Sequence, residues 1–312
     1  MRLAILFPGQ GSQSVGMLSG FAGNAAVASV MERASAALGE DLVQLASEGP
    51  AEKLNLTVNT QPVLLAVSVA FYEAFREAGG PEPALMAGHS LGEYSALTAA
   101  GSLSLEDAVP LVRFRARVMQ EAVPVGKGGM AAILGLPDEA VAAACAEAAS
   151  EGAVEPVNYN CPGQVVIAGL KPAVARACEI CREKGAKRAV ELAVSAPFHS
   201  SLLAPARDQL AHELARVSVR SAEVPVYANV DAGIHGEPDS IRSLLARQAC
   251  SPVQWVSIMR AMKEAGVTHM VECGPGRVLA GLARRCVPDI PCYGVNSAES
   301  LGAALKALAE AA

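Results

Sequence analysis

A serine between two glycines is the first group in this sequence that could act as a nucleophile. Ser90 lies in the segment Gly88-His89-Ser90-Leu91-Gly92. An apolar run precedes the segment and a helix-compatible run, 94–100, follows it, which predicts the strand, tight turn and helix of a nucleophile elbow. The glycines would leave room for a sharp turn. The turn would also place the backbone N–H of Leu91 at a helix start, where it could hold an oxyanion.

A serine hydroxyl becomes a good nucleophile only when a base accepts its proton, and histidine is the usual base. His199 lies where a small inserted domain is expected to rejoin the main one, and such junctions border clefts. We therefore predict that His199 is the base, against the alternative of a purely structural histidine. The other histidines are expected to point away from Ser90, to lie at the surface or to serve packing: His89, His212, His235 and His269. No acidic residue stands out as a third member of a triad: Glu139, Glu147, Glu151 and Glu155 lie between Ser90 and His199 but fall within the small domain, so a dyad is expected.

An arginine on an apolar helix face is the most discriminating residue. A helix over 105–122 places Arg115 at the centre of a stripe of apolar side chains. No residue three or four positions away is acidic, and a buried guanidinium is costly unless something anionic meets it. Either an acid from another element pairs with Arg115, or the carboxylate of a ligand does so.

A second turn could also supply oxyanion donors. Gly9-Gln10-Gly11 follows the first apolar run, and its backbone N–H groups and glutamine amide could approach a ligand. The turn lacks the third glycine of a dinucleotide-binding fingerprint and does not match a phosphate-binding loop.

The elements that must position these groups alternate along the chain. The patterns predict strands at 3–7, 84–87, 130–134, 154–159, 164–168, 188–194, 224–229, 269–273 and 291–295. They predict helices at 25–38, 62–78, 94–100, 105–122, 138–150, 172–184 and 205–215. Such alternation predicts an α/β fold with a parallel sheet covered on both faces, and the elbow makes it α/β-hydrolase-like.

The segment 125–196 follows a different order of elements. Its strands and helices read β-α-β-β-α-β, the order of a ferredoxin-like domain. We therefore predict a large α/β-hydrolase-like domain made of 1–124 and 197–312, with 125–196 as an inserted ferredoxin-like subdomain.

Composition limits the classes of function. The chain has 312 residues, of which 52% are hydrophobic and 4% aromatic, and its net charge is −6. A negative charge argues against general nucleic-acid binding. The apolar runs are too short for a membrane span or a signal peptide, so a cytoplasmic protein is expected. Cys178 and Cys181 are spaced like metal ligands, but no second pair completes a set, so we expect them to be packing residues and expect no metal site.

Taken together, these residues resemble the malonyl-CoA:acyl carrier protein transacylases of bacterial fatty acid synthesis. The resemblance covers nearly the full length, in order. Its segments are 7–13, 60–62, 88–94, Arg115 with 119–124, 156–158, 162–169, 195–199, 229–231, 252–255 and 274–276.

The resemblance implies a ping-pong transfer without a bound cofactor, from malonyl-CoA to the phosphopantetheine thiol of acyl carrier protein. Ser90 would carry the malonyl group and His199 would move the protons. It also implies supporting roles: the N–H groups of Gln10 and Leu91 as oxyanion hole, Arg115 as partner of the malonyl carboxylate, the main-chain carbonyl of Gln248 as orienter of the histidine, and Phe198 as a residue that favours malonyl over methylmalonyl groups.

Three other functions compete with this interpretation. An esterase or thioesterase would share Ser90 and His199 but would have no use for Arg115. An acyltransferase serving a polyketide assembly line or a malonate decarboxylase would use the same chemistry with another carrier. A non-catalytic interaction protein would need none of these groups. We expect a monomer.

Overall fold

The computed structural model describes residues 1–194 and 196–311. Ser195, the first residue of the segment 195–199, and Ala312 lie outside the described residues. The strands are β1 (Leu3–Phe7), β2 (Leu85–Gly88), β3 (Gly128–Leu134), β4 (Val154–Cys161), β5 (Gln164–Leu170), β6 (Arg188–Glu191), β7 (Val226–Tyr227), β8 (His269–Cys273) and β9 (Cys292–Val295). The helices are α1 (Ala25–Leu38), α2 (Leu42–Glu48), α3 (Ala51–Leu54), α4 (Thr57–Glu77), α5 (Leu91–Ala99), α6 (Leu105–Glu121), α7 (Asp138–Ala148), α8 (Lys171–Glu183), α9 (Ala204–Leu214), α10 (Pro238–Gln248), α11 (Trp255–Glu264), α12 (Val278–Cys286) and α13 (Ala298–Glu310).

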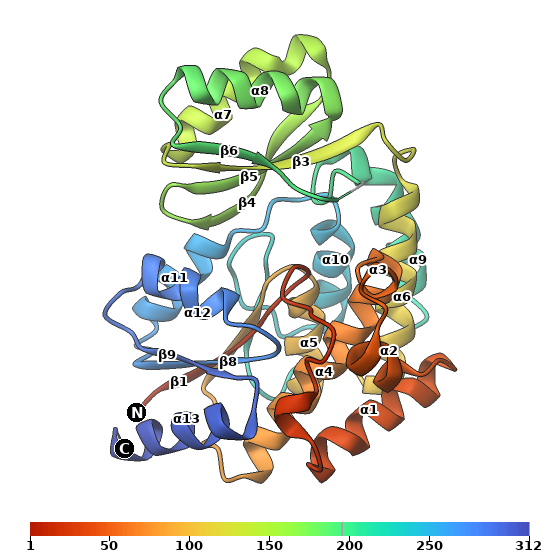
Figure 1. The fold of residues 1–312 in the computed structure, drawn as a ribbon, viewed down its shortest axis with the longest axis vertical. Coiled ribbons are helices and arrows are strands. Elements are labelled where there is room, and N and C mark those ends of the chain that lie inside the picture. The colour runs from red at the N-terminus through yellow and green to blue at the C-terminus, as the bar shows by residue number, and fades with distance from the viewer. Residues whose placement is uncertain (195, 312) are drawn as a thin grey trace.

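The larger part of the molecule is built on a parallel sheet with the strand order β7-β2-β1-β8-β9 (Figure 1). β1 lies in the middle and is buried along its whole length. Its side chains alternate between two cores: Ile5 and Phe7 pack in one, and Ala4 and Leu6 pack in the other. Both faces of the sheet are therefore covered, which confirms the predicted α/β class.

A smaller antiparallel sheet lies above the parallel one in Figure 1, with the order β4-β5-β3-β6. Its elements follow one another as β3-α7-β4-β5-α8-β6, the ferredoxin-like order. Ile133 of β3 faces the core under α7 and α8, whereas its neighbour Ala132 packs against the main core on the opposite side. This confirms the predicted fold of the insert, while its boundaries at 125 and 196 stay a prediction.

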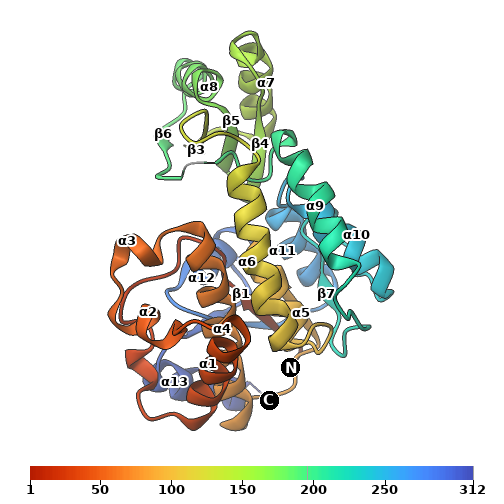
Figure 2. The ribbon, with the colours of Figure 1, turned by 90° about the vertical axis from the view of Figure 1, so that its right-hand side faces the viewer.

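α6 and β4 both bring the parallel-sheet part and the small sheet into contact. α6 runs from the parallel-sheet part up to the small sheet (Figure 2). On the other side, β4 pairs with the backbone of Val253: Val253 N–H donates to the Val157 carbonyl over 2.8 Å, and Tyr159 N–H donates to the Val253 carbonyl over 3.0 Å. The last residues of β4 are thereby held next to the elbow that follows β2.

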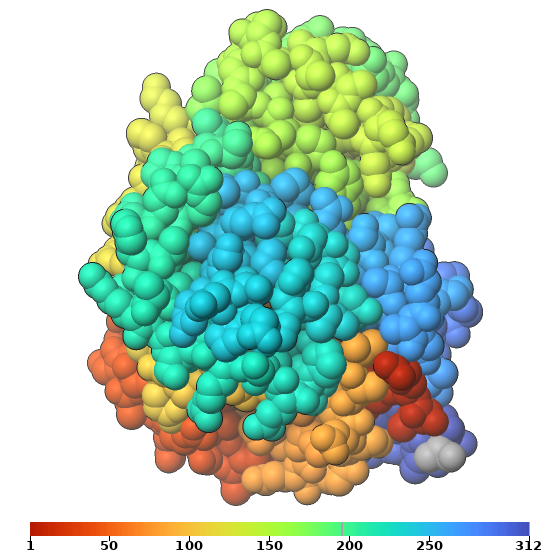
Figure 3. All heavy atoms as spheres, turned by 180° about the vertical axis from the view of Figure 1, so that it is seen from behind, coloured from red at the N-terminus to blue at the C-terminus, as the bar shows by residue number. Residues whose placement is uncertain are grey.

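The segment that carries α9 and α10 covers the middle of the molecule when it is seen from behind, below the small domain (Figure 3). α10 was not among the predicted helices, and neither were α2, α3, α11, α12 and α13. The predicted strand 224–229 is much shorter in the structure, because only Val226 and Tyr227 pair with β2. None of the helices in the described ranges is long and apolar enough to cross a membrane.

Candidate active site

Ser90 sits at the sharp turn between β2 and α5, as the elbow pattern predicts. Its φ of 53° and ψ of −110° put the serine itself in a strained conformation, and neither flanking glycine has a positive φ. The glycines are needed for space instead. A Cβ on Gly88 would overlap the carbonyl group of Gly92, and a Cβ on Gly92 would overlap the carbonyl oxygen of Phe7. The turn therefore requires small flanking residues while the strain falls on the nucleophile.

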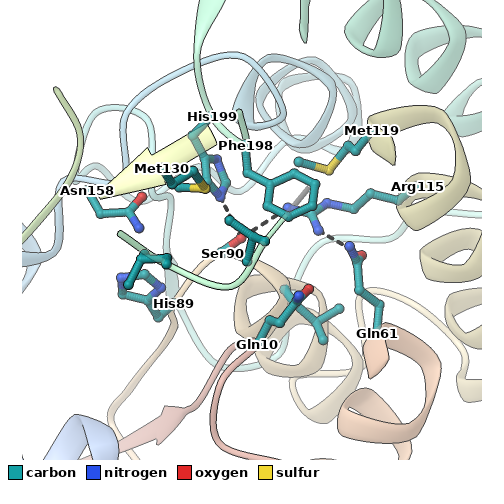
Figure 4. A pocket seen from close by; sticks show the side chains of 13 residues that line it. Gln10, Gln61, His89, Ser90, Arg115, Met119, Met130, Asn158, Phe198 and His199 are labelled. Atoms are coloured by element: carbon teal, nitrogen blue, oxygen red, sulfur yellow. Dashed lines mark hydrogen bonds between the residues drawn. The ribbon is translucent and has the colours of Figure 1, made fainter. Parts of the chain in front are cut away.

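His199 lies directly against the serine. Its Nε2 is 2.7 Å from Ser90 Oγ, and its Nδ1 donates to the main-chain carbonyl of Gln248 over 2.8 Å (Figure 4). The Gln248 carbonyl can only accept, so the proton of a neutral imidazole stays on Nδ1 and the Nε2 lone pair faces the hydroxyl. This is the geometry of a general base, with a carbonyl in place of the acid of a triad.

Burial keeps this imidazole neutral. Desolvation is the largest cause, the positive charge of Arg115 adds to it, and together they lower the pKa of His199 to about 3. The hydrogen bond to Gln248 acts in the opposite direction but is weaker. At neutral pH the free protein therefore holds His199 ready to accept a proton.

Arg115 reaches the serine from α6. It is 1% exposed, and its guanidinium donates to Gln61 Oε1 and Gln248 Oε1, both over 2.7 Å, and to Ser90 Oγ over 3.2 Å. All three acceptors are uncharged oxygens. In the described part of the chain none of the ion pairs involves Arg115, so an acid from another element does not meet it at hydrogen-bond distance. A buried cation whose hydrogen bonds all go to uncharged groups, next to a nucleophile, is suited to bind an anionic substrate group.

The pocket around Ser90 is mixed in character. Its apolar wall comes from both parts of the molecule: Met119 and Phe198 from the large part, and Met130, Leu192 and Val194 from the small one. Figure 4 shows the Phe198 ring beside Arg115 and Ser90. An apolar cavity with a few convergent polar groups is the usual form of a binding site for a small molecule.

The expected oxyanion donors flank the same pocket. Leu91 is the first residue of α5, where a backbone N–H has no partner within the helix, and Gln10 lines the pocket from the turn after β1. The Gln10 side chain donates to Thr57 Oγ1 over 3.1 Å. The structure thus brings all the predicted site residues together around one serine.

Among the remaining histidines, His89 also lines this pocket, but its ring is held by other groups. His89 Nε2 is 2.8 Å from Asn160 Oδ1 at the end of β4, and its ring packs on Trp255. His235 pairs with the exposed Asp231, and His269 stacks on Tyr293. Cys178 and Cys181 are buried on α8, and the described residues contain no group of metal-ligating side chains.

Sequence reasoning gave no role to several residues that hold the site. Gln61 and the side chain of Gln248 accept hydrogen bonds from Arg115. Asn229 accepts a hydrogen bond from the backbone N–H of Ser90, and Glu93 accepts one from the backbone N–H of Asn229. Gln61 carried one available signal, since it is a polar residue within the apolar helix α4, and buried polar residues are informative.

Comparison with known proteins agrees with this geometry. The model of the acyl transferase domain family matches residues 5–306. The chain is 51% identical to the malonyl CoA-acyl carrier protein transacylase of Escherichia coli (strain K12), over 98% of this chain and 99% of that protein. It is also similar to the crystal structure of an acyl-carrier-protein S-malonyltransferase from Burkholderia pseudomallei, with a TM-score of 0.97, 55% identity and coverage of 98% and 100%.

A further similar structure is a malonyl-transacylase in complex with a type II PKS acyl-carrier protein. It has a TM-score of 0.97 and 47% identity, and the match covers 98% of this chain and 100% of that one. A family model that spans nearly the whole chain and relatives at this level of identity leave one conclusion: the chain belongs to the acyl transferase family.

Proposed function

We propose that this enzyme transfers the malonyl group of malonyl-CoA to the phosphopantetheine thiol of acyl carrier protein, and so supplies fatty acid synthesis. The single observation that carries the proposal is Arg115, a buried guanidinium 3.2 Å from Ser90 Oγ whose hydrogen-bond acceptors are all uncharged. Acetyl and other simple acyl groups have no anionic group that could pair with the guanidinium, whereas the free carboxylate of a malonyl group would pair with it. The proposal keeps the predictions that the enzyme acts in the cytoplasm and as a monomer.

In the first half-reaction, Ser90 Oγ attacks the thioester carbonyl of malonyl-CoA while His199 Nε2 accepts the hydroxyl proton. The N–H groups of Gln10 and Leu91 would stabilise the negative charge that develops on the carbonyl oxygen. The C–S bond then breaks, and His199 returns its proton to the CoA sulfur. The product is a malonyl ester on Ser90.

The second half-reaction reverses these steps with a different thiol. His199 accepts the proton of the phosphopantetheine thiol, whose sulfur attacks the malonyl ester, and Ser90 recovers its proton as the ester C–O bond breaks. Throughout, Arg115 would hold the distal carboxylate. Phe198 would limit the space next to the α-carbon of the malonyl group and so disfavour a methyl branch. The reaction as written consumes no metal ion or redox cofactor.

A transfer assay distinguishes this proposal from the esterase alternative. With malonyl-CoA and holo acyl carrier protein, we expect malonyl-carrier to form with release of one CoA for each malonyl group moved, which mass spectrometry of the carrier would follow. Without the carrier, release of CoA should stop after one turnover. Continued release of CoA and free malonate without any carrier would identify a hydrolase.

The low pKa of His199 leads to a prediction about pH. A general base must be neutral, and in the free enzyme the pKa of His199 lies at about 3 instead of near 6.5. We therefore expect kcat/KM for malonyl-CoA, which reports the free enzyme, to stay level as the pH falls from about 8 to about 5. Stopped-flow measurement of CoA release across this range is the check. A loss of rate with an apparent pKa near 6.5 would contradict the role of burial and of Arg115.

A further inference from the structure

Glu93 is a buried acid that none of the steps above uses. It lies in the first turn of α5, is 3% exposed, and its Oε2 accepts two hydrogen bonds. One comes from Gln248 Nε2 over 2.6 Å and the other from the backbone N–H of Asn229 over 3.0 Å. Burial raises the pKa of Glu93 to about 7, against the effect of these bonds and of Arg115. Burying a carboxyl group costs free energy, so the presence of Glu93 at this position needs an explanation.

The first consequence of Glu93 is that it sets the orientation of the Gln248 amide. The Nε2 of Gln248 donates to Glu93 Oε2 and, over 2.9 Å, to the main-chain carbonyl of Ser90. The carbonyl oxygen can only accept, and so can an ionised carboxylate, so the NH2 end of the amide must face them. The Oε1 end is thereby turned to Arg115, at 2.7 Å. With the amide reversed, an NH2 group would face the guanidinium.

The second consequence concerns the strained backbone at Ser90. Its carbonyl accepts from Gln248 Nε2, and its N–H donates to Asn229 Oδ1 over 2.6 Å. Asn229 also donates from Nδ2 to the Gly88 carbonyl over 2.7 Å. Two amide side chains therefore hold the two sides of the Ser90 residue. Glu93 contacts both of these residues, because its Oε2 accepts from the side chain of Gln248 and from the backbone N–H of Asn229.

We propose that Glu93 is a positioning residue: its carboxylate oxygen, placed by α5, fixes Gln248 and Asn229 and through them holds Arg115 and Ser90 in their reactive positions. This inference rests on the proposed function, because it assigns Glu93 to the recognition of a carboxylate by Arg115. What matters is an acceptor at the position of Oε2, so the length of the side chain is critical and its charge is not. The alternative is that Glu93 has only a structural role, in which its negative charge interacts favourably with the positive, N-terminal end of the α5 dipole.

Two substitutions separate length from charge. Glu93→Gln keeps the length and an acceptor oxygen but removes the charge, whereas Glu93→Asp keeps the charge and withdraws the acceptor from Gln248. For each variant the kcat/KM for acylation is measured with malonyl-CoA and with acetyl-CoA, since only malonyl uses Arg115. We expect Glu93→Asp to lower the malonyl-to-acetyl ratio about tenfold and Glu93→Gln to keep it within about twofold of the wild type.

Glu272 provides the matched control. It is also fully buried, and it accepts from the backbone N–H groups of Leu279 and Ala280 at the start of α12. Glu272→Asp should leave the ratio unchanged. The inference is overturned if Glu93→Asp keeps the wild-type ratio, or if Glu93→Gln lowers the ratio as much as Glu93→Asp does. A wild-type protein that does not accept malonyl groups would instead overturn the proposed function.

Discussion

Replacing Ser90 by alanine is expected to lower the rate of malonyl transfer by about 10⁵-fold or more, as the loss of a covalent nucleophile does in other enzymes. The Ser90 hydroxyl is the group that His199 deprotonates, at 2.7 Å, and the acyl ester cannot form without it. Binding of malonyl-CoA should persist, because Arg115 keeps its hydrogen bonds to Gln61 and Gln248. Steady-state transfer to holo acyl carrier protein measures the effect.

Ser95 is a matched control for this substitution. It lies on α5, the helix that begins directly after Ser90, and is buried at 0% exposure, whereas Ser90 is partly exposed to the pocket; Ser95 is not among the residues that line this pocket. Ser95→Ala should keep wild-type transfer. A Ser90→Ala protein that retained more than about a hundredth of the wild-type rate would show that the reaction does not pass through this hydroxyl.

Replacing Arg115 by alanine is expected to reverse the preference of the enzyme among acyl groups. Removing one partner of a buried, hydrogen-bonded charge pair should lower kcat/KM for malonyl-CoA about a hundred- to a thousandfold. Acetyl-CoA has no distal carboxylate, so its kcat/KM should stay level or rise in the apolar space that remains. The measurement is acylation with the two thioesters in parallel.

Arg117 on the same helix serves as the control, because its side chain is exposed and its guanidinium lies over Phe114. Arg117→Ala should leave the malonyl-to-acetyl ratio as it is. If Arg115→Ala also left the ratio unchanged, Arg115 would be a structural residue and the substrate would not be defined by its carboxylate.

The sequence predicts best those elements whose signals are local. α1 has the predicted bounds because Asn24 caps its start and Gly39, in the left-handed region, ends it. β1, β2 and the turn at Ser90 likewise follow from an apolar run, two glycines and a helix-compatible run. The apolar stripe on α6 correctly places Arg115 on a buried face.

Long-range packing accounts for what could not be predicted. The strand expected at 224–229 ends early, since Asn229 is turned to bind Ser90 and Gly88 and not to extend β7. The partners of Arg115 come from α4 and α10, which are distant in sequence, so a helix projection shows that the guanidinium needs acceptors but not which ones. Glu93 gave no signal by itself. Its role depends on Gln248, 155 positions away.

The most direct test of the account is the mass of the peptide that contains Ser90 after the enzyme is mixed with malonyl-CoA and quenched. We expect the peptide to carry one malonyl group, and we expect holo acyl carrier protein to remove that group and to appear in malonylated form. The Ser90→Ala protein should carry none. A wild-type enzyme that malonylates the carrier while this peptide stays unmodified, or a malonyl group found on another residue, would contradict the account.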